Sequence, residues 1–475
     1  MNGMTGGLVL GAAVACAGLT ARGDHAGVKA VLGDTSADYV EVKDPVVKAN
    51  IERFRDMKLG LMMHFGPYSQ VGITESWPLL DPASGWERRR ALHMGVGDAF
   101  RSNYWNLART FNPIRFDADA WAEAAATNGF RYLCFTTKHH DGFAMYDTKY
   151  SDYKITAKDC PYSSRPNADM VRDIWDAFRR RGLAISCYFS KADWHHGDYW
   201  EDLGVGRRVG TLPTYDTKAH PEKWVRFERF MRDQMVELCR DYGRIEIMWL
   251  DCAFVGGRPE TRFDLSGILA ECRRYQPWLI AADRGVPGVN EQIVTPEQAV
   301  PPEPLACPWE SCITMGTGWS YRYDDTYKSA RELIQMFVGI VAKGGCLALN
   351  VGPRPDGVIP DPALRRMREM GAWLRANGAA IYASRPFAPH AVGNWRFTRR
   401  AGHFYAIRLT PDGERDVRQV LLDDGKSKGW KLARVVHVPT GAEIPFGRTD
   451  GGWLLRLPQG LVPDPAADAF ELFFD

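Results

Sequence analysis

The sequence of 475 residues contains no CxxC pair, no HExxH motif and no group of His and Cys at metal-ligand spacing, so a structural zinc site is not expected. It also lacks a long run of Lys and Arg, and its formal net charge is only +2, which argues against a dedicated nucleic-acid surface. No GxGxxG turn follows the first apolar run, which argues against a nucleotide-binding sheet. These absences leave a globular protein, for which 45% hydrophobic and 25% charged residues are typical.

The N-terminal run Leu8–Ala17 (LVLGAAVACA) is apolar but too short to span a bilayer, and no membrane span is expected. Small residues followed by a polar stretch from Arg22 are typical of a secretory signal, although no positive charge precedes the run. We therefore expect residues 1–26 to be a signal peptide and leader, and the protein to be periplasmic or extracellular. A lipid anchor on Cys16 is the alternative.

Three of the ten cysteines, Cys134, Cys187 and Cys346, lie inside apolar runs, where a thiol is a small core side chain. Cysteines in loops could instead form a disulfide, for example Cys307 with Cys312. The sequence does not decide between the two states.

Short, almost continuous apolar runs alternate with amphipathic stretches from about Lys58 to Pro353. The apolar runs are 59–66, 132–140, 183–190, 245–252, 278–285 and 345–353, and helical patterns occupy 117–129, 168–182 and 224–243. Apolar strands separated by helices predict an α/β protein whose parallel sheet is covered on both faces. With at least six strands, a (β/α)8-type (TIM-like) barrel over residues 40–384 is the favoured architecture, and a doubly wound open sheet is the alternative.

After about Ser384 the apolar runs become shorter and alternate with polar residues. Turn signals such as Pro411-Asp412-Gly413 and Asp450-Gly451-Gly452 separate them. This spacing predicts a C-terminal antiparallel β-sandwich over residues 385–475. We expect it to support the barrel rather than to bind carbohydrate, because no exposed aromatic platform can be identified.

Polar side chains follow nearly every apolar run of the predicted barrel. They are His64, Lys138, His139, His140, Asp141, Tyr188, Ser190, Trp249, Asp251, Asp283, Arg284 and Asn350. The carboxyl ends of barrel strands converge on one mouth, where catalysis occurs. Taken together, these residues predict an active site at that mouth.

Asp251 is the strongest single candidate, because a carboxylate that closes the run IEIMWL should be partly buried beside Trp249. Arg284 or the histidines could keep it ionised. An ionised Asp in this setting can attack an anomeric carbon. The alternative is a helix N-cap, but the residues after it, 252–257, are a poor helix start.

The pair His139-His140 could suggest a metal ligand set. Adjacent strand residues point to opposite sides, however, and no third ligand has a fitting spacing. We therefore expect no metal or other cofactor, and interpret the two histidines as donors to sugar hydroxyls.

A retaining mechanism also requires a general acid. The proline-rich segment 290–310 suits a path across the barrel mouth. It carries four candidates, Glu291, Glu297, Glu303 and Glu310. The residues alone do not rank them.

At these positions the sequence resembles the α-L-fucosidases of glycoside hydrolase family 29. The resemblance covers most of residues 50–385 and rests on seven segments in order. They are KLGLMMHFGPYS (58–69), TTKHHDGFAMYDTKYSDY (136–153), GLAISCYFSKADW (182–194), IMWLDC (247–252), TPEQAVP (295–301), PWESC (308–312) and VAKGGCLALNVGPRPDGVIP (341–360). It implies a retaining exo-glycosidase that hydrolyses terminal α-L-fucosyl residues of oligosaccharides or glycoconjugates.

The resemblance also implies roles for individual residues. His64, His139, His140 and Tyr188 would bind the fucose ring and its hydroxyls, Trp249 would line the pocket, and Arg284 would belong to its polar shell. Asp251 falls on the nucleophile position. Glu297 is the best match for the general acid and base, and Glu310 is the second.

Two further expectations concern the walls of the sugar pocket. Trp319 or Phe143 could receive the methyl group of fucose. The Glu-Trp pair that helps the family bind the sugar could be Glu75 with Trp77, or else Trp86-Glu87.

The sequence departs from the family pattern at Phe65, where Trp is common, at Cys252, where Gly often follows the nucleophile, and at Met62, where an aromatic residue is frequent. These departures leave the pocket and the linkage preference open. The alternatives are a related glycosidase for a sugar such as α-L-galactoside, or a glycan-binding barrel without catalysis. The oligomeric state is not given by the sequence.

Overall fold

The computed structural model describes residues 36–80, 89–201, 209–414, 417–424 and 430–475. The expected signal peptide at 1–26, the lipid-anchor candidate Cys16 and the pair Trp86-Glu87 lie outside the described residues. Among the described helices, none combines the length and the apolar character needed to cross a bilayer.

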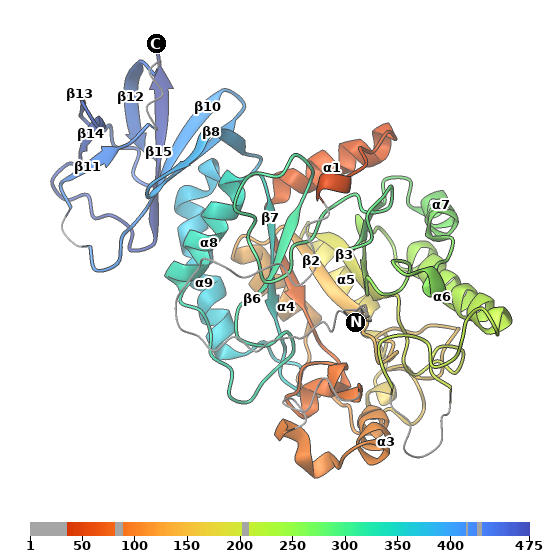
Figure 1. Ribbon diagram of the computed structural model, residues 1–475. Helices are drawn as coiled ribbons and strands as arrows, with labels where there is room; N and C mark the ends of the chain where they lie inside the picture. Colours follow the sequence, from red (N-terminus) through yellow and green to blue (C-terminus); the bar gives the residue numbers. More distant parts are fainter. Residues whose placement is uncertain (1–35, 81–88, 202–208, 415–416, 425–429) are drawn as a thin grey trace, which may run out of the picture.

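A parallel sheet of seven strands forms the centre of the molecule, in the order β5-β4-β3-β2-β1-β7-β6 (Figure 1). Its strands are β1 (Leu59–Met63), β2 (Tyr132–Lys138), β3 (Ala184–Ser190), β4 (Ile247–Asp251), β5 (Ile280–Asp283), β6 (Glu310–Thr314) and β7 (Cys346–Val351). Nearly every strand residue is buried, as expected for a parallel sheet with both faces covered. The sheet curls as in a TIM-like barrel, so the predicted architecture is confirmed.

An irregular segment, residues 290–298, lies between the two edge strands β5 and β6. Isolated bridges join Ala282 to Glu291, Val294 to Trp309 and Glu297 to Cys312. This closing segment takes the position of an eighth barrel strand, so among the described residues the barrel has seven regular strands rather than eight. Pro296 has no N–H to donate to a ladder, which limits regular pairing here.

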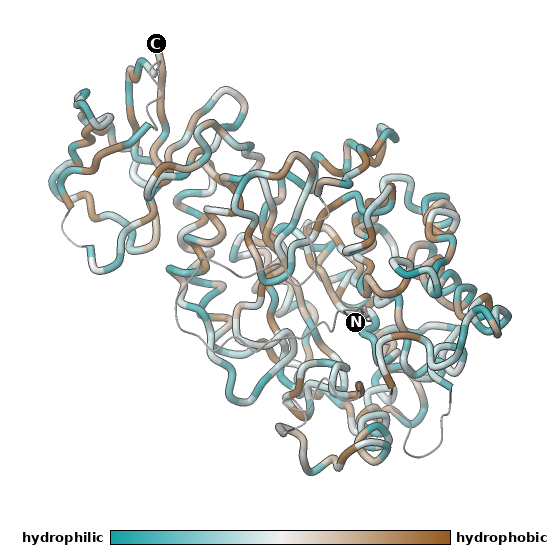
Figure 2. Tube along the Cα trace, viewed as in Figure 1, coloured by the Kyte–Doolittle hydropathy of each residue, from teal (hydrophilic) through white to brown (hydrophobic). Residues whose placement is uncertain are grey.

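Helices pack around the sheet. They are α1 (Pro45–Met57), α3 (Asp98–Asn106), α4 (Ala118–Thr127), α5 (Met170–Arg180), α6 (Pro221–Asp241), α7 (Leu265–Tyr275), α8 (Ala330–Ala342) and α9 (Asp361–Asn377). Several begin at a side chain that caps the first turn, such as Asp117 for α4, Asp169 for α5 and Asp264 for α7. Figure 2 shows apolar positions along the strands and inner helix sides, with polar positions outside.

The C-terminal residues form two antiparallel sheets, as predicted. One has the order β12-β15-β10-β9-β8 and the other β11-β14-β13. Their strands are β8 (Arg385–Val392), β9 (Trp395–Arg400), β10 (His403–Leu409), β11 (Gln419–Leu422), β12 (Leu432–His437), β13 (Phe446–Thr449), β14 (Gly452–Arg456) and β15 (Ala467–Phe474). A separate apolar core that includes Trp395, Phe397 and Leu455 fills the sandwich.

The sandwich rests on α8 and α9 at one end of the molecule (Figure 1). The Trp373 indole N–H donates to the carbonyl of Ala467 at 2.7 Å, and the Ala469 N–H donates to Asn377 at 3.0 Å. These contacts lie on the outer helices, in keeping with a supporting role. The division of the chain into 40–384 and 385–475 stays a prediction, and β8 begins at Arg385.

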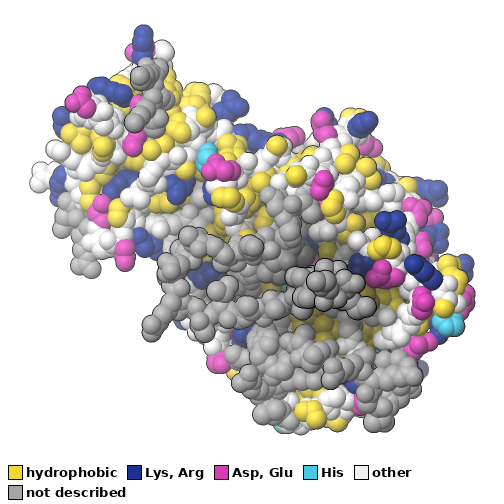
Figure 3. Space-filling view, in the orientation of Figure 1, with side chains coloured by type: hydrophobic (Ala, Val, Ile, Leu, Met, Phe, Trp, Pro, Cys, Tyr) yellow, Lys and Arg dark blue, Asp and Glu magenta, His cyan; other side chains and the backbone are white. Residues whose placement is uncertain are grey.

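All nine described cysteines are free and buried. The suggested disulfide between Cys307 and Cys312 is therefore wrong, because Cys312 lies within β6. On the face seen in Figure 3, Lys and Arg side chains lie among Asp and Glu side chains and apolar ones.

Candidate active site

The carboxyl ends of the barrel strands bring the predicted site residues together. His64 follows β1, His139 and His140 follow β2, Tyr188 lies on β3, and Trp249 and Asp251 lie on β4. The His64 ring packs against Tyr188 at a centroid distance of 5.3 Å, and the His139 ring stacks parallel to Tyr188 at 5.8 Å. The strand-end pattern of the sequence therefore corresponds to one aromatic and charged cluster.

Asp251 is held by three hydrogen bonds. Its Oδ1 accepts from Arg284 Nη1 at 2.6 Å and from the backbone N–H of Cys252 at 2.8 Å. Its Oδ2 accepts from the Tyr188 hydroxyl at 2.5 Å, and His140 Nε2 lies 3.9 Å from the same oxygen. The side chain is nevertheless 18% exposed, so the carboxylate is oriented by the protein and open to the barrel mouth.

Charge and burial compete over the protonation of Asp251. Burial opposes ionisation, but Arg284, His140 and the hydrogen bonds from Tyr188 and Cys252 outweigh it and hold the pKa of this carboxyl well below its usual value. Asp251 is therefore an ionised carboxylate at neutral pH.

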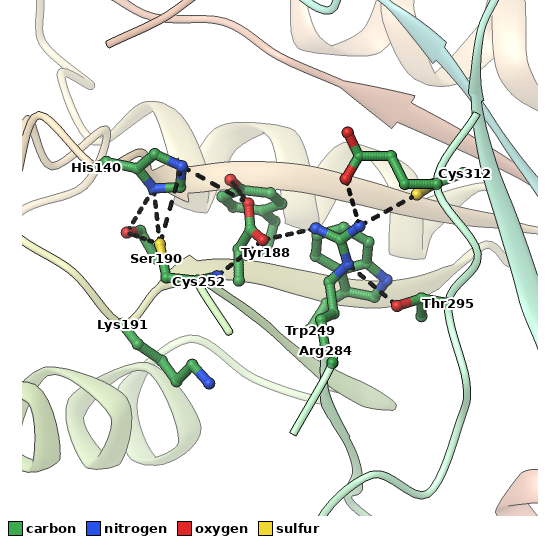
Figure 4. A network of polar contacts seen from close by, with 12 residues as sticks. His140, Tyr188, Ser190, Lys191, Trp249, Cys252, Arg284, Thr295 and Cys312 are labelled. Carbon is green, nitrogen blue, oxygen red and sulfur yellow. Dashed lines mark hydrogen bonds and ion pairs between the residues drawn. The ribbon is translucent and has the colours of Figure 1, made fainter. Parts of the chain in front are cut away.

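Arg284 joins Asp251 to a second carboxylate, Glu297. Its Nη1 donates to Asp251 Oδ1 at 2.6 Å, and its Nη2 donates to Glu297 Oε2 at 2.8 Å. The guanidinium lies over the ring of Trp249, 4.1 Å from its centroid, and its Nε donates to Thr295 at 3.1 Å (Figure 4). Arg284 is 3% exposed whereas Glu297 is 21% exposed, so the two acids reach the mouth and the cation that links them does not.

The histidine pair differs from the geometry expected from the sequence. Because β2 ends at Lys138, His139 and His140 lie beyond the strand and their rings lie side by side, with centroids 3.9 Å apart. Alternation of side chains therefore does not separate them, and that argument against a metal site was wrong. His139, His140 and Asp251 offer ligand atoms within 4.8 Å of one another, which is close enough for a cation; the metal-free site stays a prediction.

Both rings are oriented by serines. Ser76 contacts His139 Nδ1 at 2.6 Å, and Ser190 contacts His140 Nδ1 at 2.9 Å. Burial lowers the pKa of His139 well below its usual value and that of His140 to about 4. At neutral pH these are uncharged imidazoles that can exchange hydrogen bonds with hydroxyl groups.

His64 completes the imidazole group. Its Nδ1 contacts Asn350 Oδ1 at 2.8 Å, and burial lowers the pKa of its ring to about 4. Trp319 packs against the same ring at 5.2 Å and is partly exposed. The apolar ring of Trp319 thus lies beside the uncharged, hydrogen-bonding ring of His64.

Glu310, the second candidate for the acid, lies elsewhere. It is the first residue of β6 and is 2% exposed, inside the barrel. Its Oε1 accepts from the Trp249 indole at 3.1 Å, and its Oε2 accepts from the Tyr132 hydroxyl. Burial raises the pKa of this carboxyl to about 7. Both oxygens are engaged below the mouth, which argues against contact with a leaving group.

The structure separates the remaining pocket candidates. Trp77 is partly exposed and meets His140 edge to face at 5.1 Å. Glu75 is 1% exposed and accepts from the Ser320 backbone at 2.7 Å, so it connects the Trp77 segment to that of Trp319.

Phe143 does not form a pocket wall. It is 2% exposed and packs in the core against Phe111 and Tyr153, with centroids at 6.0 and 5.1 Å. The expectation that it could receive the methyl group is therefore wrong, since its ring is buried among these aromatic side chains.

Sequence reasoning missed three supporting residues: Ser76, Thr295 and Cys312. Ser76 orients His139, whereas Thr295 and the Cys312 thiol contact Arg284 at 3.1 and 3.6 Å. The only signal was proximity in the sequence to Trp77, Glu297 and Glu310, because the partner of a hydroxyl or thiol depends on the fold.

Comparisons with known proteins agree with this geometry. A model of the alpha-L-fucosidase family matches residues 28–379. Human plasma alpha-L-fucosidase is 27% identical over 347 residues, which cover 69% of this chain and 68% of that protein. An alpha-L-fucosidase of Dictyostelium discoideum is 27% identical over 429 residues, which cover 85% of this chain and 88% of that protein. Among solved structures, alpha-L-fucosidase isoenzyme 1 from Paenibacillus thiaminolyticus has a TM-score of 0.73 at 27% identity and covers 90% of this chain and 100% of its own. The chain belongs to the alpha-L-fucosidase family of glycoside hydrolases, family 29.

Proposed function

We propose that the protein removes terminal α-L-fucosyl residues from glycans by double displacement, with Asp251 as nucleophile and Glu297 as general acid and base. The observation that carries this proposal is that both carboxylates contact the terminal nitrogens of one guanidinium, at 2.6 and 2.8 Å. A guanidinium spans only a few ångströms, so this arrangement suits the separation of about 5 to 5.5 Å between the carboxyl groups of retaining glycosidases.

In the first step an oxygen of Asp251 forms a bond to the anomeric carbon while the glycosidic bond breaks. Glu297 gives its proton to the departing oxygen, and the product is a fucosyl ester of Asp251. In the second step Glu297 takes a proton from water, the water oxygen bonds to the anomeric carbon, and Asp251 leaves. Two inversions return the original configuration.

The two contacts of Arg284, one with Asp251 and one with Glu297, have different roles. Its bond to Asp251 favours the carboxylate that attacks. Its contact with Glu297 occupies Oε2, so Glu297 must exchange Arg284 for the glycosidic oxygen before it can donate a proton. Substrate entry provides that exchange, because the leaving oxygen occupies the space between the two acids.

The walls of the site suit a deoxy-sugar. His64, His139 and His140 are uncharged at neutral pH and present ring nitrogens to hydroxyl groups. Trp319 offers an apolar face beside His64, which suits a methyl group better than a hydroxymethyl group.

The test is hydrolysis of 4-nitrophenyl α-L-fucoside by the full chain, with the anomer of the first product followed by NMR. We expect α-L-fucose first, and kcat/KM at least about 100-fold higher than for the α-L-galactoside, because a buried extra hydroxyl lacks a partner. Release of β-L-fucose, or binding of the fucoside without turnover, would contradict the proposal.

Glu297→Ala tests the acid and base. We expect hydrolysis of a fucosyl disaccharide to fall about 10²- to 10⁴-fold, because its leaving oxygen needs a proton. For α-L-fucosyl fluoride, whose leaving group needs no proton, the rate of the first step should fall much less. Added azide should restore turnover of the variant and give α-fucosyl azide. Equal losses on both substrates would contradict the assignment.

We also propose export of the protein, with removal of a leader within residues 1–26. The N-terminal apolar run supports this, as does the name of the human plasma relative. Mass spectrometry of the mature protein from its natural host should find an N-terminus after residue 15. An intact Met1 in the cell interior would contradict it.

A further inference from the structure

Trp249 lies between the two side chains that hold Asp251. On one side, Tyr188 on β3 stacks on the indole with centroids 5.1 Å apart and ring planes 25° apart. On the other side, Arg284, which follows β5, lies 4.1 Å above the ring centroid. Since β4 lies between β3 and β5 in the sheet, the indole separates these two partners (Figure 4). The plane of Trp249 therefore sets where the Tyr188 hydroxyl and the Arg284 guanidinium stand.

A hydrogen bond from below fixes that plane. The indole N–H of Trp249 donates to Glu310 Oε1 at 3.1 Å. Glu310 is held in turn by the hydroxyl of Tyr132, which donates to Oε2. Tyr132 occupies space that Gly60 leaves open on the neighbouring strand, because a Cβ at Gly60 would lie 2.1 Å from the tyrosine ring.

The chemistry of Glu310 is not that of a space-filling residue. Burying a carboxyl group is unfavourable, and an apolar side chain of similar size would fill the same position without that cost. What the carboxyl adds is an acceptor with a defined direction for the indole N–H, and a second oxygen that anchors it to β2 through Tyr132. The two hydrogen bonds of Glu310 therefore bear on the orientation of Trp249.

We propose that Glu310 is a positioning residue for the reaction, which through the Trp249 indole keeps Tyr188 and Arg284 in contact with Asp251. This inference rests on the proposed function. On this inference Glu310 is not the general acid. It acts from a buried position and reaches Asp251 only through Trp249 and then Tyr188 or Arg284.

The experiment compares Glu310→Gln with Glu310→Leu on 4-nitrophenyl α-L-fucoside and on a fucosyl disaccharide. Gln keeps an acceptor for the indole and can donate to the Tyr132 oxygen, so we expect its kcat to stay within about fivefold of the unaltered protein. Leu leaves the indole N–H without a partner, and we expect kcat to fall about 30- to 100-fold with KM within about threefold, since misplacement of catalytic groups has effects of this size. The losses should be equal on both substrates.

A double-mutant cycle separates positioning from general destabilisation. Trp249→Phe removes the N–H that Glu310 accepts, so adding Glu310→Leu to that variant should lower kcat by less than about threefold further. Independent, multiplying effects of the two changes would overturn the proposal. So would a Glu310→Leu protein with unaltered kcat.

Other outcomes remain informative. If Glu310→Gln lowers kcat more on the disaccharide than on the aryl fucoside, and azide restores turnover, Glu310 is the general acid. That result would overturn the proposal. If Glu310→Leu does not fold, Tyr132→Phe removes only the hydroxyl that anchors Glu310, and we expect kcat to fall about three- to tenfold with unchanged KM; unchanged kcat in that variant would overturn the proposal. Failure of the proposed function would be seen separately, as a lack of fucoside hydrolysis by the unaltered chain.

Discussion

Two neighbouring strands of the barrel each end in an aspartate, and the two aspartates behave differently. Asp251 ends β4 and Asp283 ends β5. Asp251 is 18% exposed and pairs with a guanidinium that a second acid shares. Asp283 is 5% exposed and pairs with the amine of Lys191, which has no exposed surface. Burial outweighs Lys191 and raises the pKa of Asp283, whereas the partners of Asp251 hold its pKa well below the usual value.

The difference shows that a charge at a strand end is not sufficient for reactivity. A reactive carboxylate needs ionising partners on one side and an open edge on the other. Asp283 lacks the open edge, so its ion pair with Lys191 can only hold β3 to β5 around β4. Lys138 with Asp193 is a second pair of this closed kind, with exposures of 0% and 3%.

The largest effect should follow from changing the open aspartate. We expect Asp251→Ala to lower kcat on the aryl fucoside by about 10⁴-fold or more, because no group can form the covalent intermediate. Unfolding in urea should change little, since Arg284 keeps Glu297 as its partner. Azide should restore turnover and give β-fucosyl azide; α-fucosyl azide would place the nucleophile elsewhere.

The closed pair should show the reverse pattern. Lys191→Met leaves Asp283 buried without a cation, and we expect the free energy of unfolding to fall by about 3 to 5 kcal/mol while kcat changes less than about tenfold. Adding Asp283→Leu should recover most of the loss. The matched control is Arg180→Met, which breaks an exposed pair with Asp119 and should leave unfolding unchanged. If Lys191→Met instead lowers kcat strongly while the free energy of unfolding is unchanged, Lys191 contributes to catalysis and the prediction is wrong.

Glu310 extends the comparison to a closed carboxyl without a cation in hydrogen-bond contact. Its pKa in the folded chain is about 7, above the ordinary value of 4.5, so the native state binds more protons than the unfolded state between these pH values. Stability must then fall as pH rises through that window. Relative to Glu310→Gln, the unaltered protein should lose about 3 kcal/mol of unfolding free energy between pH 4.5 and 7. A pH-independent difference in urea titrations would contradict the buried, protonated state.

The smallest effect should come from Cys252, which follows Asp251 with a φ of 78°. A left-handed conformation disfavours any residue with a Cβ by about 1 to 2 kcal/mol, and Cys252→Gly removes that strain. The variant also loses the thiol that lies 3.1 Å from His140 Nδ1, but Ser190 still contacts that nitrogen. We expect stability to change by less than about 1 kcal/mol and kcat by less than about threefold. A tenfold loss of kcat would show that the thiol itself orients His140.

Much of the barrel was predictable from the sequence, because parallel strands buried on both faces produce apolar runs and their ends carry polar residues. The run that ends in Asp251 and the helix over 170–180 are examples. The same pattern marked Asp283 and Asp251 alike, since exposure at a strand end depends on the loops that cover it. The pattern also could not distinguish Glu297 from Glu310. Glu297 lies on the closing segment, whereas Glu310 is the first residue of β6, inside the barrel.

The closing segment has a consequence for how enzymes of this architecture can diversify. Asp251 belongs to a strand whose position is set by ladders on both sides, so it can shift only in whole-residue steps that would disrupt the barrel. Glu297 sits on a stretch attached by isolated bridges, where an inserted or deleted residue lengthens a connection without breaking a ladder. Insertions or deletions in this segment can move Glu297 toward a different glycosidic oxygen while Asp251 stays in place. The linkage preference can therefore change without disruption of the barrel.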